Sequence, residues 1–99
     1  MVKRIVMMNL LPGTEGQFLE KFETVRKEIR NQRGCKGLEL LRGSEKEETS
    51  FCTISLWLSV DDLETYRASP LFQKTWAEVR PLFSNKARVW TLDSILSMP

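Results

Sequence analysis

The spacing of hydrophobic and polar residues predicts an alternation of strands and helices. Residues 3–10 (KRIVMMNL) form a short apolar run that closes on a Pro-Gly turn, which is typical of a strand. Four apolar positions then recur every three or four residues and predict one face of a helix: Phe18, Phe22, Val25 and Ile29. Thr14 and Gln17 have the spacing of a capping box, so this helix is expected to begin at Thr14 and to end before Gly34.

Two more strand-like runs follow this helix, at residues 35–42 (CKGLELLR) and 51–58 (FCTISLWL). Both are rich in apolar residues and are short enough for strands. The segment that joins them, residues 43–50 (GSEKEETS), is polar throughout. The sequence therefore predicts a hairpin with a long loop.

The last third of the chain predicts two helices and a strand. Ser59 and the Ser69-Pro70 pair are signals that start helices, and residues 85–96 (NKARVWTLDSIL) predict a final strand. The resulting order predicts an α+β fold, a ferredoxin-like split βαβ arrangement (β-α-β-β-α-β) with an antiparallel sheet and helices on one face. Ninety-nine residues suit one domain, so residues 1–99 are expected to fold as a single unit.

The strand predicted at residues 51–58 has two unlike sides. One side is uniformly apolar and is expected to meet the helices: Cys52, Ile54, Leu56 and Leu58. The other side mixes aromatic rings with hydroxyls and is expected on the open face of the sheet: Phe51, Thr53, Ser55 and Trp57. Polar groups among aromatic rings are typical of a small-molecule site. The open face is therefore the predicted location of the site.

The first predicted strand carries large apolar residues on both of its sides. Val6, Met8 and Leu10 lie on one side, and Ile5 and Met7 lie on the other. Such a strand is normally covered on both faces, and the helices cover only one. We therefore expect a homodimer packed sheet on sheet, with Trp57 either anchoring that interface or contacting a substrate. The alternative is a monomer whose own C-terminal segment, SILSMP, caps the open face.

Composition and charge narrow the range of functions. The net charge is +2 and basic residues alternate with acids, which argues against a nucleic-acid or membrane partner. The chain has no histidine, and Cys35 and Cys52 lack the spacing of metal ligands, so no metal site is expected. No segment approaches the length that spans a membrane, and reduced cysteines fit a cytoplasmic location.

Two stretches, RGCKGLELLR and ISLWLSVDDLETYRASPLFQKTW, resemble the antibiotic biosynthesis monooxygenase family within the dimeric α+β barrel superfamily. The shared features are a Gly-Cys turn after the first helix, a strand ending in tryptophan, and a Ser-Pro-x-Phe-x-x-x-Trp segment. The resemblance covers nearly the whole chain. It implies a range of activities, because some members oxygenate quinols, anthrones or polyphenols without metal or flavin, others degrade haem, and some process small signalling molecules.

The haem-degrading branch of that family allows a comparison residue by residue. It uses an asparagine late in the first strand, a tryptophan on the second-helix segment, and a haem-ligating histidine ten residues further on. Asn9 fits the first position, but Tyr66 stands at the tryptophan position and Trp76 at the histidine position. Without histidine, imidazole ligation of haem iron is impossible, although a tyrosine can ligate ferric haem. We expect no haem-degrading activity and no cofactor.

The activity that the resemblance still implies is oxygenation of a small electron-rich aromatic substrate by dioxygen. Tyr66 and Asn9 are the expected catalytic residues, with Tyr66 orienting a substrate hydroxyl or relaying its proton. The expected substrate contacts are Phe51, Thr53, Ser55, Trp57 and Trp76. The alternative function is a non-enzymatic dimeric module that binds a small ligand or regulates another process.

Two points of this hypothesis stay open at the level of sequence. Trp76 shares a helical stripe with Phe72 and Val79, so it fits core packing as well as a pocket wall. With histidine absent, the proton acceptor is Tyr66, water held by Asn9, or an acid on a strand; Glu39 and Asp93 are the acids considered.

Overall fold

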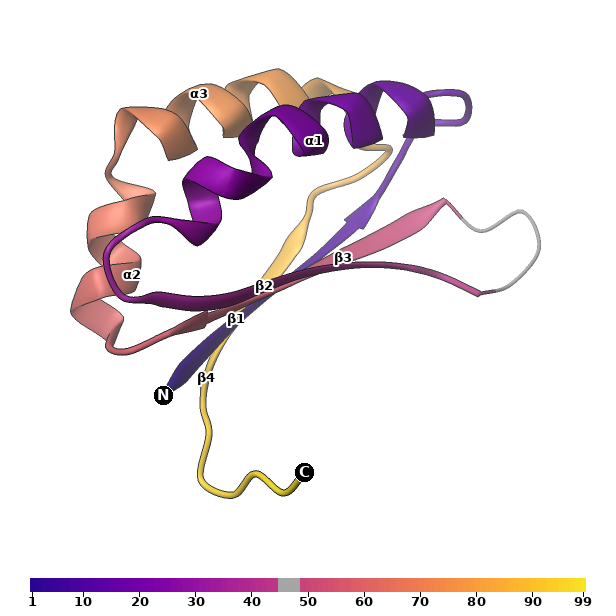
Figure 1. The fold of residues 1–99 in the computed structure, drawn as a ribbon. Coiled ribbons are helices and arrows are strands. Elements are labelled where there is room, and N and C mark those ends of the chain that lie inside the picture. Colours follow the sequence, from indigo (N-terminus) through magenta and orange to yellow (C-terminus); the bar gives the residue numbers. More distant parts are fainter. Residues whose placement is uncertain (45–48) are drawn as a thin grey trace.

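The computed structural model describes residues 1–44 and 49–99, and its elements follow the predicted order (Figure 1). The strands are β1 (Val2–Asn9), β2 (Cys35–Arg42), β3 (Ser50–Trp57) and β4 (Arg88–Asp93). The helices are α1 (Glu15–Arg30), α2 (Val60–Arg67) and α3 (Pro70–Val79), and a short 3-10 turn, η1 (Arg80–Leu82), follows α3. The predicted final strand was too long at both ends. Of the predicted loop at residues 43–50, residues 45–48 lie outside the described residues.

The strands form one antiparallel sheet in the order β2-β3-β1-β4. The three helices lie over the same face of this sheet, and the opposite face is open (Figure 1). This arrangement confirms the ferredoxin-like α+β fold that the sequence predicts. Within the described ranges, every helix is too short or too polar to cross a bilayer.

Serine side chains begin two of the helices, as predicted. The hydroxyl oxygens of Ser59 and Ser69 each accept a hydrogen bond from the backbone N–H three residues later, at 3.1 and 3.2 Å. The capping box predicted at Thr14 is wrong. The Thr14 hydroxyl donates to the carbonyl oxygen of Leu11 at 2.7 Å and makes no bond to the helix that it precedes. The hydroxyl is therefore bonded to the turn before the helix and not to the helix itself.

Gly34 turns the chain from α1 into β2, and its backbone has a φ of 79°. This left-handed conformation is costly for residues that carry a Cβ. A Cβ at position 34 would also lie 2.5 Å from the Cβ of Asp62, in the first turn of α2. Glycine is therefore required here for two independent reasons, and it lets α2 approach this turn closely.

The hydrophobic core lies between the sheet and the helices in two clusters. The first contains Val2, Val25, Ile29, Cys35, Trp57, Leu63 and Tyr66. The second contains Val6, Met8, Leu10, Phe18, Phe51, Val79 and Leu82. The predicted apolar face of α1 is confirmed, because Phe18, Val25 and Ile29 are all buried against the sheet.

The prediction of which side of β3 faces the helices is wrong. Phe51, Ser55 and Trp57 are buried under the helices, and the exposed fraction of Trp57 is 0%. The alternate residues, such as Ile54, pair with the outward-facing side of β1 and remain partly exposed. Trp57 is therefore a core residue and not an anchor of a subunit interface. Its indole N–H can be buried because it donates to the Ser55 hydroxyl oxygen at 2.9 Å.

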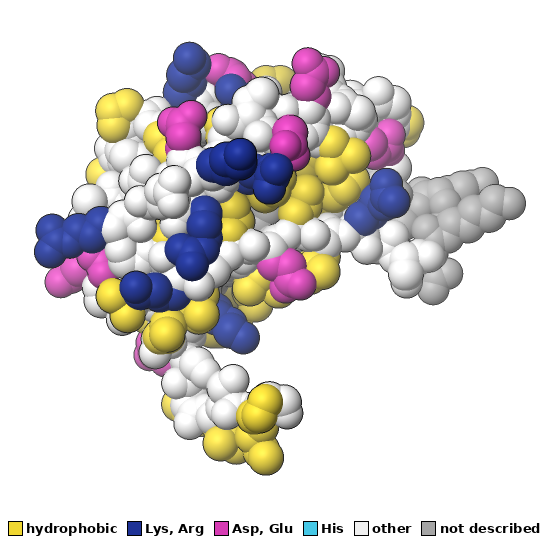
Figure 2. Space-filling view, in the orientation of Figure 1, with side chains coloured by type: hydrophobic (Ala, Val, Ile, Leu, Met, Phe, Trp, Pro, Cys, Tyr) yellow, Lys and Arg dark blue, Asp and Glu magenta, His cyan; other side chains and the backbone are white. Residues whose placement is uncertain are grey.

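The open face of the sheet is strongly apolar. Alternation along the strands and their register place eight such side chains on it: Ile5, Met7, Leu41, Cys52, Ile54, Leu56, Trp90 and Leu92. The C-terminal segment does not cover this face, since Ile95 is 97% exposed and the tail stands away from the rest of the chain (Figure 2). The alternative of a monomer capped by its own tail is therefore wrong.

Candidate functional site

A cavity of about 80 Å³ lies between the sheet and the helices. Strand residues form part of its floor, among them Arg4, Thr53 and Ser55. The helices supply an aromatic wall made of Phe22, Tyr66, Phe72 and Trp76. A mostly apolar cavity with a few converging polar groups is the usual form of a small-molecule site.

Four of the side chains predicted to form the site line this cavity: Thr53, Ser55, Tyr66 and Trp76. The structure thus brings these four predicted residues together, on the helix-covered face of the sheet and not on the open face. Phe51 is buried in the second core cluster, where its ring contacts that of Phe18 at 5.2 Å between centroids. Phe51 and Trp57 therefore support the cavity from within the core, and neither is among its lining residues.

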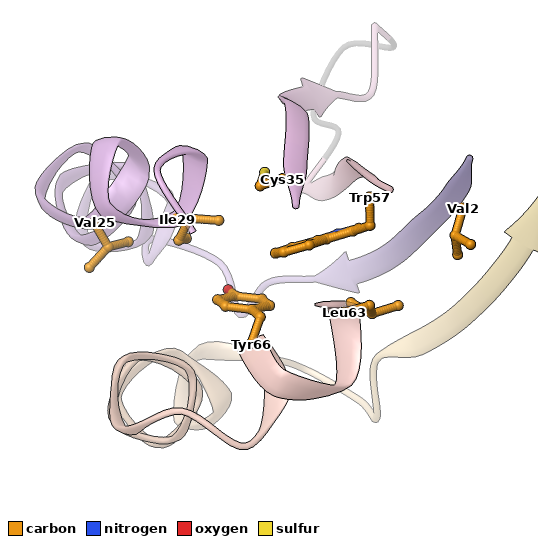
Figure 3. Close-up of a cluster of buried hydrophobic side chains, with 7 residues drawn as sticks. All are labelled: Val2, Val25, Ile29, Cys35, Trp57, Leu63 and Tyr66. Atoms are coloured by element: carbon orange, nitrogen blue, oxygen red, sulfur yellow. The ribbon is translucent and has the colours of Figure 1, made fainter. Parts of the chain in front are cut away.

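Trp57 and Tyr66 hold each other in place at one end of the cavity. Their rings stack with centroids 5.0 Å apart and an interplanar angle of 22°, Trp57 coming from β3 and Tyr66 from α2 (Figure 3). Ser55 fixes the indole of Trp57 through its hydrogen bond. The position of the Tyr66 phenol is consequently set by the sheet as well as by its own helix.

A series of ring contacts extends the aromatic wall away from Tyr66. Tyr66 meets the edge of Phe72 at 5.2 Å between centroids, and Phe72 stacks on Trp76 at 6.0 Å. Trp76 in turn contacts Phe83 at 5.6 Å. Trp76 therefore packs with core aromatic residues and also lines the cavity, which are the two positions that the sequence left open for it.

The phenol of Tyr66 is a hydrogen-bond donor and not a base at neutral pH. Burial raises the pKa of Tyr66 to about 12, with Cys35 acting in the same direction and Arg4 opposing it. The residue is 8% exposed, and within the described residues its hydroxyl makes no hydrogen bond. A protonated phenol without a partner is available to a ligand in the cavity.

Asn9 lies outside the cavity. Alternation along β1 places its side chain on the open face, where it accepts a hydrogen bond from the Ser50 hydroxyl at 2.6 Å and donates to Asn85 at 3.3 Å. The grouping of Asn9 with Tyr66 in one site is therefore wrong. Glu39 also belongs to the open face, and Asp93 is exposed on the edge strand β4. None of the three is positioned to accept a proton in the cavity.

Arg4 is the residue that sequence reasoning missed. It lies on β1 between the buried Val2 and Val6, and it lines the cavity with an exposed fraction of 5%. The signal was present in the sequence, since the alternation of Val2, Arg4, Val6 and Met8 puts a cation at an inward-facing position. Among residues 1–44 and 49–99, no cluster of three or more His, Cys, Asp or Glu side chains could hold a metal ion.

Comparison with known proteins agrees with this fold. The sequence profile of the antibiotic biosynthesis monooxygenase family matches residues 1–78. No functionally curated protein matches the chain. Among solved structures, a protein from Bordetella bronchiseptica described as belonging to that family is 24% identical, with a TM-score of 0.82 over 96% of this chain and 97% of its own.

Two further solved structures are similar in fold at lower identity. A protein from Caulobacter crescentus described in the same terms is 20% identical, with a TM-score of 0.87 over 96% of this chain and 90% of its own. SnoaB, a cofactor-independent oxygenase from Streptomyces nogalater, is 18% identical, with a TM-score of 0.86 over 99% of this chain and 96% of its own. Since the family profile covers more than half of the chain, this protein belongs to the antibiotic biosynthesis monooxygenase family.

Proposed function

We propose that this protein is a cofactor-independent monooxygenase that acts on a small electron-rich phenol of the quinol, anthrone or polyphenol type. The observation that carries the proposal is the cavity between sheet and helices, where the unpaired hydroxyl of Tyr66 lies among aromatic walls. Family membership and the similarity in fold to SnoaB, a cofactor-independent oxygenase, support it. In this reaction one oxygen atom of dioxygen enters the substrate and the other leaves as water, and the substrate supplies the electrons.

The size of the cavity favours a substrate with one ring. Its volume is about 80 Å³, whereas an apolar cavity of about 150 Å³ is known to hold benzene. A single ring therefore requires a modest widening, and a fused tricyclic substrate requires the helices to move away from the sheet. Within the class named above, single-ring quinols are the expected best substrates.

Tyr66 is proposed to donate a hydrogen bond to the substrate oxygen that becomes negative when the phenol loses its proton, before an electron passes to dioxygen. Because the pKa of Tyr66 is about 12, its proton stays in place at neutral pH. Thr53 and Ser55 would orient the ring from the sheet, and Trp76 would face it from α3.

The functional unit is proposed to be a cytoplasmic homodimer in which the open faces of two sheets pack together. The eight apolar side chains of this face are partly or largely exposed in the single chain. A second copy would present the same face, which is the self-complementary contact that a two-fold dimer requires.

The test is oxygen uptake by purified, chelator-treated protein with a panel that runs from methylhydroquinone to a naphthohydroquinone and anthrone. Uptake above the rate of the substrate alone is expected, together with one labelled oxygen per product molecule when isotopically labelled dioxygen is used. Tyr66→Phe is expected to lower kcat about 10²-fold, the usual scale for losing one donor to a developing oxyanion.

Thr65→Val is the matched control, because it removes an exposed hydroxyl from the neighbouring position of α2. It should leave turnover unchanged. No uptake above background across the panel would reject the monooxygenase and favour the ligand-binding module. A thermal-shift screen with the same compounds would then detect that module, since a ligand that binds only the folded state raises Tm.

A further inference from the structure

The guanidinium of Arg4 is buried at a position where the alternation of β1 otherwise provides apolar side chains. Its cross-strand neighbours are Ser55 on β3 and Thr91 on β4. The side chain rises from the sheet toward the helices, because its guanidinium carbon lies 5.6 Å from the ring centroid of Phe72 on α3. This places the charge between the two layers, at the cavity.

Arg4 has no acceptor among the described residues. Its guanidinium forms neither a hydrogen bond nor an ion pair with these residues. It lies over the face of the Phe72 ring, a cation–π contact. Burial lowers the pKa of Arg4 and the nearby Arg67 lowers it further, while Tyr66 and Glu64 act in the opposite direction; a guanidinium remains charged at neutral pH. Among the described residues, no fully enclosed side-chain nitrogen or oxygen lacks a hydrogen-bond partner, so the Arg4 nitrogens reach the open part of the cavity. An anionic ligand there can pair with the charge and accept from its donors.

The cavity offers donors and carries no carboxylate. Its lining contains no Asp or Glu, and Lys21, the other cation there, is paired with Glu78. The Tyr66 hydroxyl is free to donate, and it lies close enough to Arg4 for each to affect the pKa of the other. Ser55 accepts from Trp57 and keeps its own hydroxyl proton for another acceptor. The electrostatic character of the cavity is therefore positive.

We propose that the cavity binds its aromatic ligand as a phenolate anion, with the anionic oxygen held by the guanidinium of Arg4 and the hydroxyl of Tyr66. The inference rests on the proposed function and specifies the ionic state of the substrate. The phenol loses its proton to the bulk solvent as it binds, so the cavity needs no basic side chain. A neighbouring cation typically lowers the pKa of an acid by about 1–3 pH units, and a lowering of this size is expected for the bound phenol.

The experiment uses binding alone, so that it does not depend on turnover. The probe is 4-nitrophenol, a single ring whose anion absorbs visible light and whose binding can be followed under anaerobic conditions. The bound probe should be ionised at pH values where free 4-nitrophenol is still protonated. 4-Nitroanisole has the same ring but cannot ionise, and it should bind at least about tenfold more weakly, because Arg4 then keeps an unpaired charge.

Arg4→Met tests the residue, because it keeps an unbranched side chain and removes the charge. It should weaken nitrophenolate binding at least about tenfold and restore the ordinary pKa of the bound phenol, and it should not weaken 4-nitroanisole binding. Arg4→Lys should retain part of the effect. Arg26→Met is the control, since it removes an exposed charge that is paired with Glu23 and does not line the cavity.

The wild-type protein alone can overturn the inference. It would do so by binding nitrophenol with its ordinary pKa, or by binding 4-nitroanisole as tightly as nitrophenol. Tighter binding of benzoate than of nitrophenolate would assign Arg4 to a carboxylate ligand instead. If nitrophenolate binds through Arg4 but no substrate causes oxygen uptake, the inference holds and the proposed monooxygenase function is rejected. If Arg4→Met changes neither oxygen uptake nor nitrophenolate binding, the inference is rejected and the proposed function stands.

Discussion

Replacing Gly34 by alanine should destabilise the fold by far more than the same change at Gly13. Both glycines have a left-handed backbone, with φ of 79° at Gly34 and 85° at Gly13. An L residue in this region costs about 1–2 kcal/mol, and the gain from restricting the unfolded chain offsets roughly half of that. Gly13→Ala should therefore lower the free energy of unfolding by about 1 kcal/mol, because nothing lies within 4 Å of its new Cβ.

Gly34→Ala has a second cost. Its Cβ would lie 2.2 Å from the Oδ2 atom and 2.5 Å from the Cβ of Asp62. Rotating the Asp62 side chain moves the oxygen but not the Cβ, so the backbone of α2 must shift. Overpacking of this kind typically costs 1–3 kcal/mol, which brings the total to about 2–4 kcal/mol. For a domain of this size that corresponds to a Tm lower by about 10–25 °C.

Thermal unfolding followed by circular dichroism measures both variants. Gly13→Ala should lose about 4–8 °C and serves as the matched control. Asp62→Ala in the Gly34→Ala background should recover only part of the loss, because the Cβ of residue 62 remains. Equal losses in the two glycine variants, or full recovery with Asp62→Ala, would refute the explanation by helix displacement. A displaced α2 should also weaken ligand binding, since Tyr66 lies one turn after Asp62.

Two further predictions concern the open face and the buried phenol. Ile54→Glu should convert the proposed dimer to a monomer in light scattering, because an unpaired buried charge costs about 3 kcal/mol or more. Leu19→Glu, an equivalent change at an exposed position of α1, should keep the mass of the wild type; a monomeric wild type at micromolar concentration would reject the dimer. Protonated Tyr66 stabilises the fold fully below pH 10, and this contribution should be lost as the pH rises toward 12, its pKa in the folded state. As the pH rises from 10 to 12, the wild type should lose about 2–3 kcal/mol more stability than Tyr66→Phe. Tyr66 is the chain's single tyrosine, and it should show no phenolate absorbance near pH 10 while the protein is folded.

Local signals in the sequence were sufficient to predict the order of the elements. The strand runs, the helical stripe of α1 and the caps at Ser59 and Ser69 each depend on residues close together in the chain, and all are confirmed. The cap at Thr14 failed because its hydroxyl had a second acceptor, the carbonyl of Leu11, which only the folded turn brings within reach.

The two sides of β3 could not be assigned from the sequence, because both fit a buried face. The side with Trp57 and Ser55 looked too polar for a core, yet the indole N–H and the serine hydroxyl satisfy each other at 2.9 Å. The side with Ile54 looked like a core face and is instead apolar and open. An apolar strand face shows that something covers it, and it does not show whether that cover is the chain's own helices or another molecule.

The candidate site was only partly predictable for the same reason. Tyr66 and Ser55 line one cavity with aromatic walls, whereas Asn9, which was predicted to share their site, faces the other way. Arg4 was passed over because basic residues are normally solvated. Its inward position follows from alternation with Val2 and Val6. A charged residue at an inward-facing position of a strand therefore indicates a candidate site.

The three tryptophans of the chain occupy three different environments, and this makes its intrinsic fluorescence unusually informative. Trp57 is sealed in the core, Trp76 lines the cavity, and Trp90 is 39% exposed on the open face with the guanidinium of Arg88 5.2 Å above its ring. Loss of emission from Trp57 reports unfolding, and quenching of Trp76 reports a ligand entering the cavity. Iodide in solution, drawn to Arg88, should quench Trp90 in a free chain and lose access to it once two sheets pack together. Three single Trp→Phe variants would thus separate folding, binding and association into three optical signals from one unlabelled protein.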